Sequence, residues 1–197
     1  MSDVRFLVIS GSARTSSFNR RLASVAGQQL RDAGVEVTDV DLAALDLPIY
    51  HADVEASRMP EGARRLRDLF AAHDGLLLAT PEYNGFPTPL LINALDWATR
   101  PAAEEGAPAG IAALTGTVAG LLSASPGVHG GLRSLLATRQ FLQMNLGMIV
   151  VPEQFGLGSA GQAFDESGQL VDAKARDGVS RVVNAAVRVA RALNRAS

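Results

Sequence analysis

The clearest indication of the fold is the segment Leu76-Leu77-Leu78-Ala79, which is followed by Thr80-Pro81-Glu82-Tyr83-Asn84-Gly85-Phe86-Pro87. Its first four residues form a short, continuous apolar run, which is typical of a strand buried on both faces of a parallel sheet. The next eight combine prolines with an Asn-Gly turn signal, and a helical pattern begins after them. The pattern predicts a loop at the carboxyl end of a buried strand, where open α/β sheets bind ligands.

Similar runs alternate with helical patterns along the whole chain. Strands are predicted at residues 6–9, 35–40, 76–80, 117–123 and 148–151, with Pro152 closing the last one. Helices are predicted from residue 18 to 33, from 59 or 60 to Asp74, and at 88–99, 131–146 and 173–193. Residues 41–57 and 101–110 are expected to be irregular connections. This α/β alternation implies a parallel sheet covered on both faces.

Five strands with short loops favour a flavodoxin-like three-layer sandwich, with a five-stranded parallel sheet and helices on both faces. The sequence contains neither an internal repeat nor a domain-scale linker. Residues 1–197 are therefore predicted to form a single domain.

Composition excludes several classes of protein. Of the 197 residues, 47% are hydrophobic, which is enough for a sizeable core, and the formal net charge of −2 favours neither a nucleic acid nor a membrane surface as partner. Cysteine is absent, so disulfides, thiolate nucleophiles and cysteine metal ligands are excluded. The start, Met1-Ser2-Asp3-Val4, lacks a basic segment and a long apolar run, so we expect a cytoplasmic protein with no membrane span.

The loop after the first strand, Ser10 to Asn19, consists of small and polar residues before a helix. A helix N-terminus presents unpaired amides and a partial positive charge, both of which favour a phosphate. Arg14 can add a charged contact. The side chains that can add donors are those of Ser12, Thr15, Ser16, Ser17 and Asn19. The alternative is ordinary N-capping of the helix by Ser16 or Ser17.

Two common phosphate-binding motifs are excluded for this loop. A P-loop would end in Gly-Lys-Ser/Thr, whereas the only lysine of the chain is Lys174. The Gly-x-Gly-x-x-Gly fingerprint of dinucleotide-binding folds is absent as well.

A third loop, Ser123 to Gly131, follows the fourth strand and contains Ser125-Pro126-Gly127. Glycines allow a backbone to approach a ligand closely, so we expect this loop to form another wall of the site. His129 is interpreted as a polar residue at the rim rather than an acid or base. The histidines at 51, 73 and 129 lack the spacing of a metal site, and none is predicted.

Two other residues leave alternatives open. Glu82 can orient a ligand or cap the next helix, and catalysis is disfavoured because no partner acid is evident. Trp97 can stack on a ligand, pack at a subunit interface or lie in the core.

The three loops together resemble the NADPH-dependent FMN reductases of the flavodoxin-like superfamily, which include bacterial quinone, chromate and azo-dye reductases. The matching stretches run from Gly11 to Asn19, from Pro81 to Gly85 with Asn93 to Trp97, and from Ser123 to Gly127 with Gly130 to Arg133. Val151 to Glu153 and Phe164 to Gly168 match as well, so the matching stretches together span nearly the whole chain. One departure is Phe86-Pro87-Thr88-Pro89, where relatives commonly have a serine and a Pro-Gly pair; it makes the surroundings of the ring more apolar.

The resemblance implies an FMN phosphate held by Ser12, Arg14, Ser17, the Phe18 amide and Asn19. It also implies a flavin ring held by Pro81, Glu82, Tyr83, Asn84 and Gly85, with Ser125, Pro126 and Gly127 near the opposite edge. The expected activity is transfer of hydride from NADPH or NADH through flavin N5 to a small oxidised acceptor, with no catalytic side chain. A homodimer or homotetramer is implied, packed through the helices after strands three and four. The alternatives are an electron carrier of flavodoxin type and an FMN-binding protein without turnover.

Overall fold

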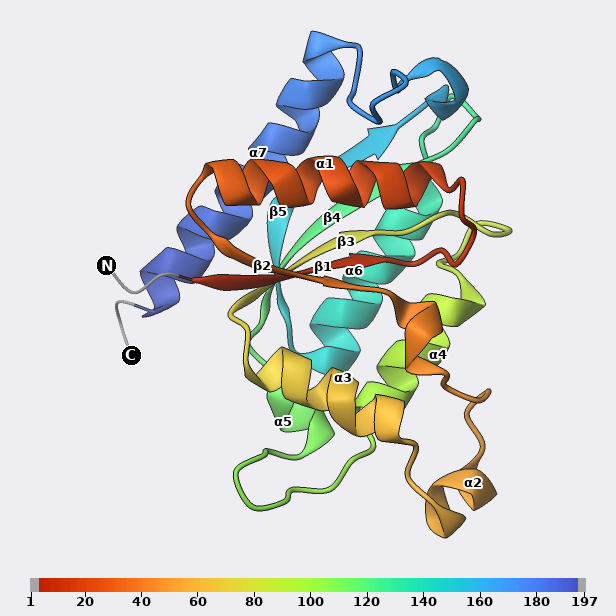
Figure 1. Cartoon of the computed structure of the whole chain (residues 1–197), viewed down its shortest axis with the longest axis vertical. Coiled ribbons are helices and arrows are strands. Elements are labelled where there is room, and N and C mark those ends of the chain that lie inside the picture. The colour runs from red at the N-terminus through yellow and green to blue at the C-terminus, as the bar shows by residue number, and fades with distance from the viewer. Residues whose placement is uncertain (1–3, 195–197) are drawn as a thin grey trace.

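The computed structural model describes residues 4–194, which fold around one five-stranded parallel sheet (Figure 1). The strand order is β2-β1-β3-β4-β5, and every neighbouring pair is parallel. The strands are β1 (Arg5–Ser10), β2 (Glu36–Val40), β3 (Gly75–Ala79), β4 (Val118–Ala124) and β5 (Ile149–Leu157). This confirms the predicted flavodoxin-like architecture.

The apolar runs lie at the centre of the sheet. Every residue of β3 and β4 is buried, as expected for strands covered on both faces. The alternating run of the second strand forms the edge strand β2, none of whose residues is fully buried. The carboxyl ends of β1, β3 and β4 therefore meet side by side at one edge of the sheet.

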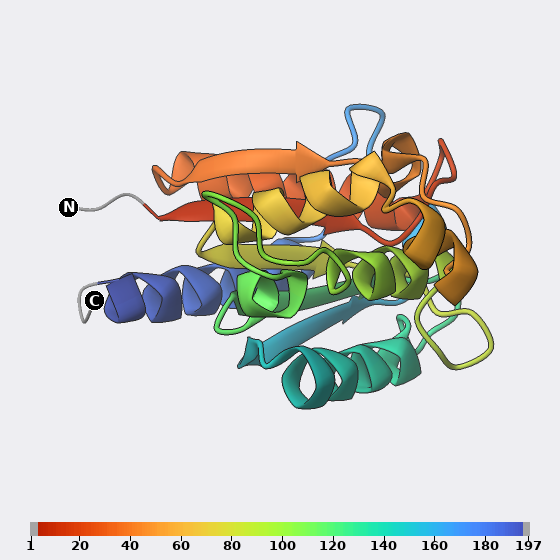
Figure 2. The same cartoon turned by 90° about the horizontal axis from the view of Figure 1, so that it is seen from below.

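Helices cover both faces of the sheet and lie above and below it in Figure 1, while Figure 2 looks onto the lower of these two layers. One core cluster joins the sheet to α1 (Phe18–Asp32) and α7 (Ala173–Asn194), and a second joins the opposite face to the other long helices. The remaining elements are α2 (Ala52–Ser57), α3 (Glu61–Ala71), α4 (Pro89–Ala98), α5 (Gly110–Leu114) and α6 (Leu132–Leu146), with short 3-10 turns at Leu42–Leu45 and Ala160–Gln162.

Two short helices correct the expectation of five. Within residues 4–194 there are seven α-helices, because α2 lies in the connection expected to be irregular and α5 begins at the end of the other. Helix α2 buries none of its residues, so it carries no apolar periodicity that a sequence pattern could reveal.

The prediction that Pro152 closes the fifth strand is wrong, because β5 continues to Leu157. Its pairing with β4 passes from Ala119↔Val150 to Leu121↔Gln154, so β5 contains two extra residues at this point. Proline is tolerated at such an irregularity of an edge strand. Arg139 of α6 donates to the backbone oxygens of Val150 and Pro152 at 3.4 and 3.3 Å, which satisfies carbonyls that the irregular ladder frees.

Across residues 4–194, no helix combines the length and apolar character needed to cross a membrane. Residues 1–3, which carried the expectation about the start of the chain, lie outside the described residues.

Candidate functional site

The loops after β1, β3 and β4 surround a cavity of about 160 Å³ at the carboxyl edge of the sheet. Most of the predicted site residues line it. The lining residues are Ser12, Arg14, Ser17, Phe18, Asn19, Pro81, Glu82, Tyr83, Ala124, Ser125 and Pro126. The predicted residues outside this lining are Asn84, Gly85 and Gly127. Separate segments of the sequence are thus brought together as the strand order requires.

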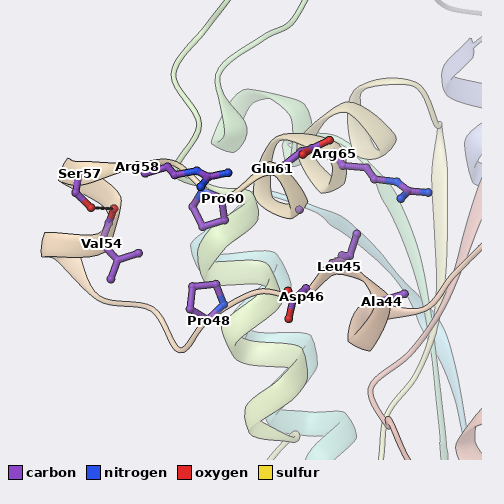
Figure 3. A pocket seen from close by; sticks show the side chains of 11 residues that line it. Ala44, Leu45, Asp46, Pro48, Val54, Ser57, Arg58, Pro60, Glu61 and Arg65 are labelled. Carbon is purple, nitrogen blue, oxygen red and sulfur yellow. Dashed lines mark hydrogen bonds between the residues drawn. The ribbon is translucent and has the colours of Figure 1, made fainter.

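A larger cavity of about 630 Å³ lies elsewhere, between α2, the N-terminus of α3 and the segment that precedes α2 (Figure 3). None of the predicted site residues lines it. Its charged side chains are Asp46, Arg58, Glu61 and Arg65, two of each sign, so it does not select a ligand charge. We take the smaller cavity as the candidate site because it lies where the strand ends and their loops converge.

The first loop combines helix capping with free donors. Ser17 is the N-cap of α1, and its Oγ accepts the amides of Asn19 and Arg20 at 3.2 and 3.4 Å. This confirms the capping alternative for Ser17. No acceptor within residues 4–194 bonds the backbone N–H groups of Thr15, Ser16 or Phe18. Capping and anion binding are therefore compatible, since the capped helix still offers amides at the cavity.

Arg14 supplies the positive charge at this cavity. Its guanidinium lies 5.5 Å from the centre of the Phe18 ring and donates to the backbone oxygen of Ser16 at 3.2 Å. No carboxylate in the described part of the chain forms an ion pair with it. Together with the hydroxyls of Ser12 and Ser17, this donor set has the chemistry of a phosphate site.

Asn19 has a role that the sequence did not reveal. Its Nδ2 donates to the backbone oxygen of Ala124 at 2.8 Å, and its Oδ1 accepts the Ala124 amide at 2.9 Å. Only 3% of Asn19 is exposed. The side chain thus fastens the first turn of α1 to the end of β4, which fixes the first and third loops relative to each other.

The second loop is a tight hairpin turn. Tyr83 and Phe86 exchange two backbone hydrogen bonds of 2.8 and 3.0 Å, and the intervening Asn84 and Gly85 have φ angles of 53° and 85°. Positive φ at both central positions is characteristic of a type I′ turn, which explains the Asn-Gly pair. Asn84 and Gly85 occupy the tip of this turn, away from the cavity, whereas Tyr83 lines it.

Glu82 caps a helix, but not the one expected. Its Oε2 accepts the backbone amides of Arg133 and Ser134 at 3.0 and 3.3 Å, and its Oε1 accepts Arg133 Nε at 2.7 Å. These groups belong to the N-terminus of α6, whose N-cap residue Gly131 offers no side chain. Burial acts to raise the pKa of Glu82, but the bonds from Arg133 and Ser134 outweigh it and lower the pKa.

Two hydroxyls, absent from the predicted set, hold the second loop. Thr88 caps α4 by accepting the Leu91 amide, and it donates to the backbone oxygen of Gly11 at 2.6 Å. Ser134 Oγ donates to the backbone oxygen of Pro81 at 2.9 Å. The first and second loops are therefore joined directly, and α6 supports the second loop from behind. The only sequence signal for the role of either hydroxyl is that Thr88 precedes Pro89 at a helix start.

The third loop packs against the end of β5. Ser125 Oγ accepts the Gly127 amide at 3.1 Å, and the Ser125 backbone bonds Leu157 and Ala160. His129 is exposed, as its interpretation as a rim residue requires.

Trp97 lies in the core and outside the cavity. It is fully buried, its Nε1 donates to the backbone oxygen of Pro48 at 2.7 Å, and the Tyr50 ring meets it edge-on at 5.1 Å. Of the alternatives for this residue, the structure supports core packing.

The chemistry available at the cavity is recognition of an anion and of a flat surface rather than acid–base catalysis. Glu82, its one carboxylate, is occupied by α6. Within residues 4–194, no cluster of three or more His, Asp or Glu side chains could hold a metal ion.

Comparison with known proteins agrees with this geometry. The model of the family described as NADPH-dependent FMN reductase matches residues 4–162. An NAD(P)H-dependent FMN reductase of Pseudomonas aeruginosa is 35% identical over 185 residues, which cover 93% of both chains. A quinone reductase of Pseudomonas putida is 36% identical over 166 residues, or 84% of this chain and 83% of the relative. Among solved structures, FerB, a flavoenzyme NAD(P)H:(acceptor) oxidoreductase from Paracoccus denitrificans, matches with a TM-score of 0.78 at 27% identity, covering 95% of this chain and 97% of FerB.

Proposed function

The chain belongs to the NADPH-dependent FMN reductase family, and on that basis we propose that it is an FMN-dependent NAD(P)H oxidoreductase acting on a small oxidised acceptor. The acceptor class comprises quinones, azo compounds, metal oxyanions and free flavin. The observation that carries this proposal is the donor set at the N-terminus of α1, placed beside the loop that follows β3. Bound FMN would supply the hydride chemistry, and the chain would supply binding, orientation and charge.

The first loop would hold the terminal phosphate. The Phe18 amide and the Ser17 hydroxyl have hydrogens left to donate, and Arg14 adds a positive charge without a competing carboxylate. Ser12 Oγ accepts the Arg14 amide at 3.4 Å, so its own hydrogen is also available. Because α1 is fastened to β4 through Asn19, these donors are positioned before any ligand arrives, which lowers the entropic cost of binding.

The second and third loops would face the ring system. Pro81, Tyr83 and Pro126 offer rigid, largely apolar surfaces at the cavity. Glu82 is 11% exposed, and its charge is compensated by Arg133 and the α6 amides. The ring would therefore not face an uncompensated negative charge, which would oppose the gain of electrons by an oxidised flavin.

The alternatives are an electron carrier of flavodoxin type and an FMN-binding protein without turnover. A net charge of −2 offers little of the acidic surface with which such a carrier would dock a redox partner. Steady-state oxidation of NADPH and NADH by the purified protein with FMN separates the alternatives. We expect turnover with menadione, ferricyanide or free FMN; flavin binding without turnover on any of them would refute the reductase assignment.

We also propose that the chain forms a homodimer through α4 and α6. On α6, Leu132, Leu136 and Met144 are 46%, 54% and 79% exposed, and on the second loop Phe86 is 67% exposed. A helix face that stays in solvent is normally polar, so these exposed apolar side chains favour a surface that another chain covers. Sedimentation should give a dimer or, by further pairing, a tetramer, and Leu136→Glu should weaken it. The matched control is Val171→Glu, since Val171 is 55% exposed just before α7, which covers the opposite face of the sheet. A monomer at micromolar concentration would refute this part of the proposal.

The single domain and the cytoplasmic location remain part of the proposal. The location fits an enzyme that uses NAD(P)H, a reductant of the cell interior, and the single domain fits the one sheet around which residues 4–194 fold.

A further inference from the structure

Two arginines and two phenylalanines form a continuous series beside the candidate cavity. The rings of Phe18 and Phe164 are parallel, with an interplanar angle of 1° and centroids 6.4 Å apart. The guanidinium of Arg14 lies 5.5 Å from the Phe18 centroid, and that of Arg21 lies 5.9 Å from the Phe164 centroid. Phe18 and Arg14 line the cavity, whereas Phe164 does not. Phe164 comes from the segment between β5 and α7, far along the sequence.

This segment, residues 158–172, has a defined conformation of its own. Phe164 forms an isolated bridge with Leu170, which is 2% exposed and packs in the core beside α1 and α7. Between them, the Asp165 carboxylate accepts the hydroxyl of Ser167 at 2.7 Å and the amide of Gln169 at 2.9 Å. The turn therefore presents the Phe164 ring at a fixed position against Phe18.

Arg14 has few other restraints. Apart from its stacking on Phe18, its guanidinium is held by one bond to the backbone oxygen of Ser16 in the same loop. An exposed arginine loses much rotamer freedom when it is ordered. A side chain that orders the arginine before the ligand arrives therefore lowers the entropic cost of binding. The Phe18 ring provides that surface, and the Phe18 ring is itself kept in place by Phe164.

We propose that Phe164 is a positioning residue for the anion site: it holds the Phe18 ring on which the Arg14 guanidinium rests at the cavity. This inference depends on the proposed function, since it concerns the terminal phosphate of FMN. It assigns to the segment after β5 a contribution to phosphate affinity that is made without contact with the ligand. Because the effect passes through Arg14, it concerns the phosphate and not the ring system of the flavin.

Riboflavin isolates this contribution, because it has the ring system of FMN and lacks the phosphate. Dissociation constants of both flavins are measured by fluorescence titration for the wild type, Phe164→Leu and Phe164→Tyr. Leucine keeps most of the apolar volume without the ring, whereas tyrosine keeps the ring. We expect Phe164→Leu to weaken FMN binding by roughly two- to fivefold, the worth of an exposed cation–π contact. Riboflavin affinity should stay unchanged, and Phe164→Tyr should restore FMN affinity.

A double mutant separates positioning from general stability. In an Arg14→Ala background, Phe164→Leu should leave FMN affinity unchanged, because the group through which it acts is gone. Phe155→Leu is the matched control, since Phe155 is another half-buried phenylalanine packed against the same core cluster. Equal losses for FMN and riboflavin, or a Phe164 effect that adds fully to that of Arg14→Ala, would overturn the inference while leaving the proposed function intact. A wild-type protein that binds neither flavin would overturn the proposed function itself, and the inference with it.

Discussion

Replacing Asn19 with alanine should destabilise the protein in the absence of any ligand. The Asn19 side chain bonds both the amide and the carbonyl of Ala124, at 2.9 and 2.8 Å, and Ala124 is itself only 4% exposed. The substitution leaves a buried donor and a buried acceptor without partners. Each such group costs about 1–3 kcal/mol, so the free energy of unfolding should fall by about 2–6 kcal/mol. That is a large part of the roughly 5–15 kcal/mol typical of a folded domain.

Urea denaturation of the flavin-free protein, followed by far-UV circular dichroism, measures this loss. Asn184→Ala is the matched control, since Asn184 is exposed in the middle of α7 and alanine should slightly favour that helix. Asn19→Asp is a second probe: it keeps an acceptor for the Ala124 amide but places an oxygen against the Ala124 carbonyl, so it should also destabilise. The reasoning is refuted if Asn19→Ala unfolds within about 0.5 kcal/mol of the wild type, the range of an ordinary surface substitution. A loss of FMN affinity with unchanged stability would then make Asn19 a ligand-binding residue only.

Three further substitutions test the loops. Arg14→Ala should weaken FMN binding by roughly 1.5–3 kcal/mol in a fluorescence titration, the worth of a charged hydrogen bond, whereas Arg65→Ala in the larger cavity should not; the reverse pattern would place the flavin in the larger cavity. Glu82→Gln should lower the free energy of unfolding at pH 7 by about 1–3 kcal/mol. Because the pKa of Glu82 in the folded protein lies below its ordinary 4.5, the carboxylate stabilises above that pH and loses its effect as the pH falls through the folded pKa. The difference in the free energy of unfolding between Glu82→Gln and the wild type, measured by urea titration, should therefore shrink as the pH is lowered. A difference that does not depend on pH would contradict the assignment. Thr88→Val should cost about 1–3 kcal/mol of stability, because it removes the α4 cap and leaves the Gly11 carbonyl unpaired, while Thr88→Ser should stay close to wild type.

The fold was largely predictable because its strands are short apolar runs with helical patterns between them. The central strands β3 and β4 are buried throughout, and their largely apolar composition indicates this burial directly. Two features were missed for physical reasons. Helix α2 has no buried face. Strand β5 passes through Pro152 at an irregular step of the ladder, where Arg139 of α6 donates to the carbonyls of Val150 and Pro152, and no local pattern indicates this partner.

The walls of the candidate site were also predictable, since loops at adjacent strand ends must converge. The bonds that hold those loops together were not. Asn19 meets Ala124 across 105 positions, and Thr88 meets Gly11 across 77 positions, so no local pattern connects them. Glu82 is a related case: the capping alternative pointed to the helix that follows its own loop, whereas its carboxylate is bonded to the N-terminus of α6.

The irregularity at Pro152 limits how this part of the chain can change in length. Side chains of a strand alternate between the two faces with a period of two, and the two extra residues in β5 preserve that alternation. Val151 at the start of the irregularity and Leu157 after it therefore face the same core, beside α1 and α7. Insertions or deletions here can be accommodated in pairs, whereas a single-residue change would turn Leu157 to the opposite face. The chain that follows, including Phe164, would then start from the wrong side of the sheet.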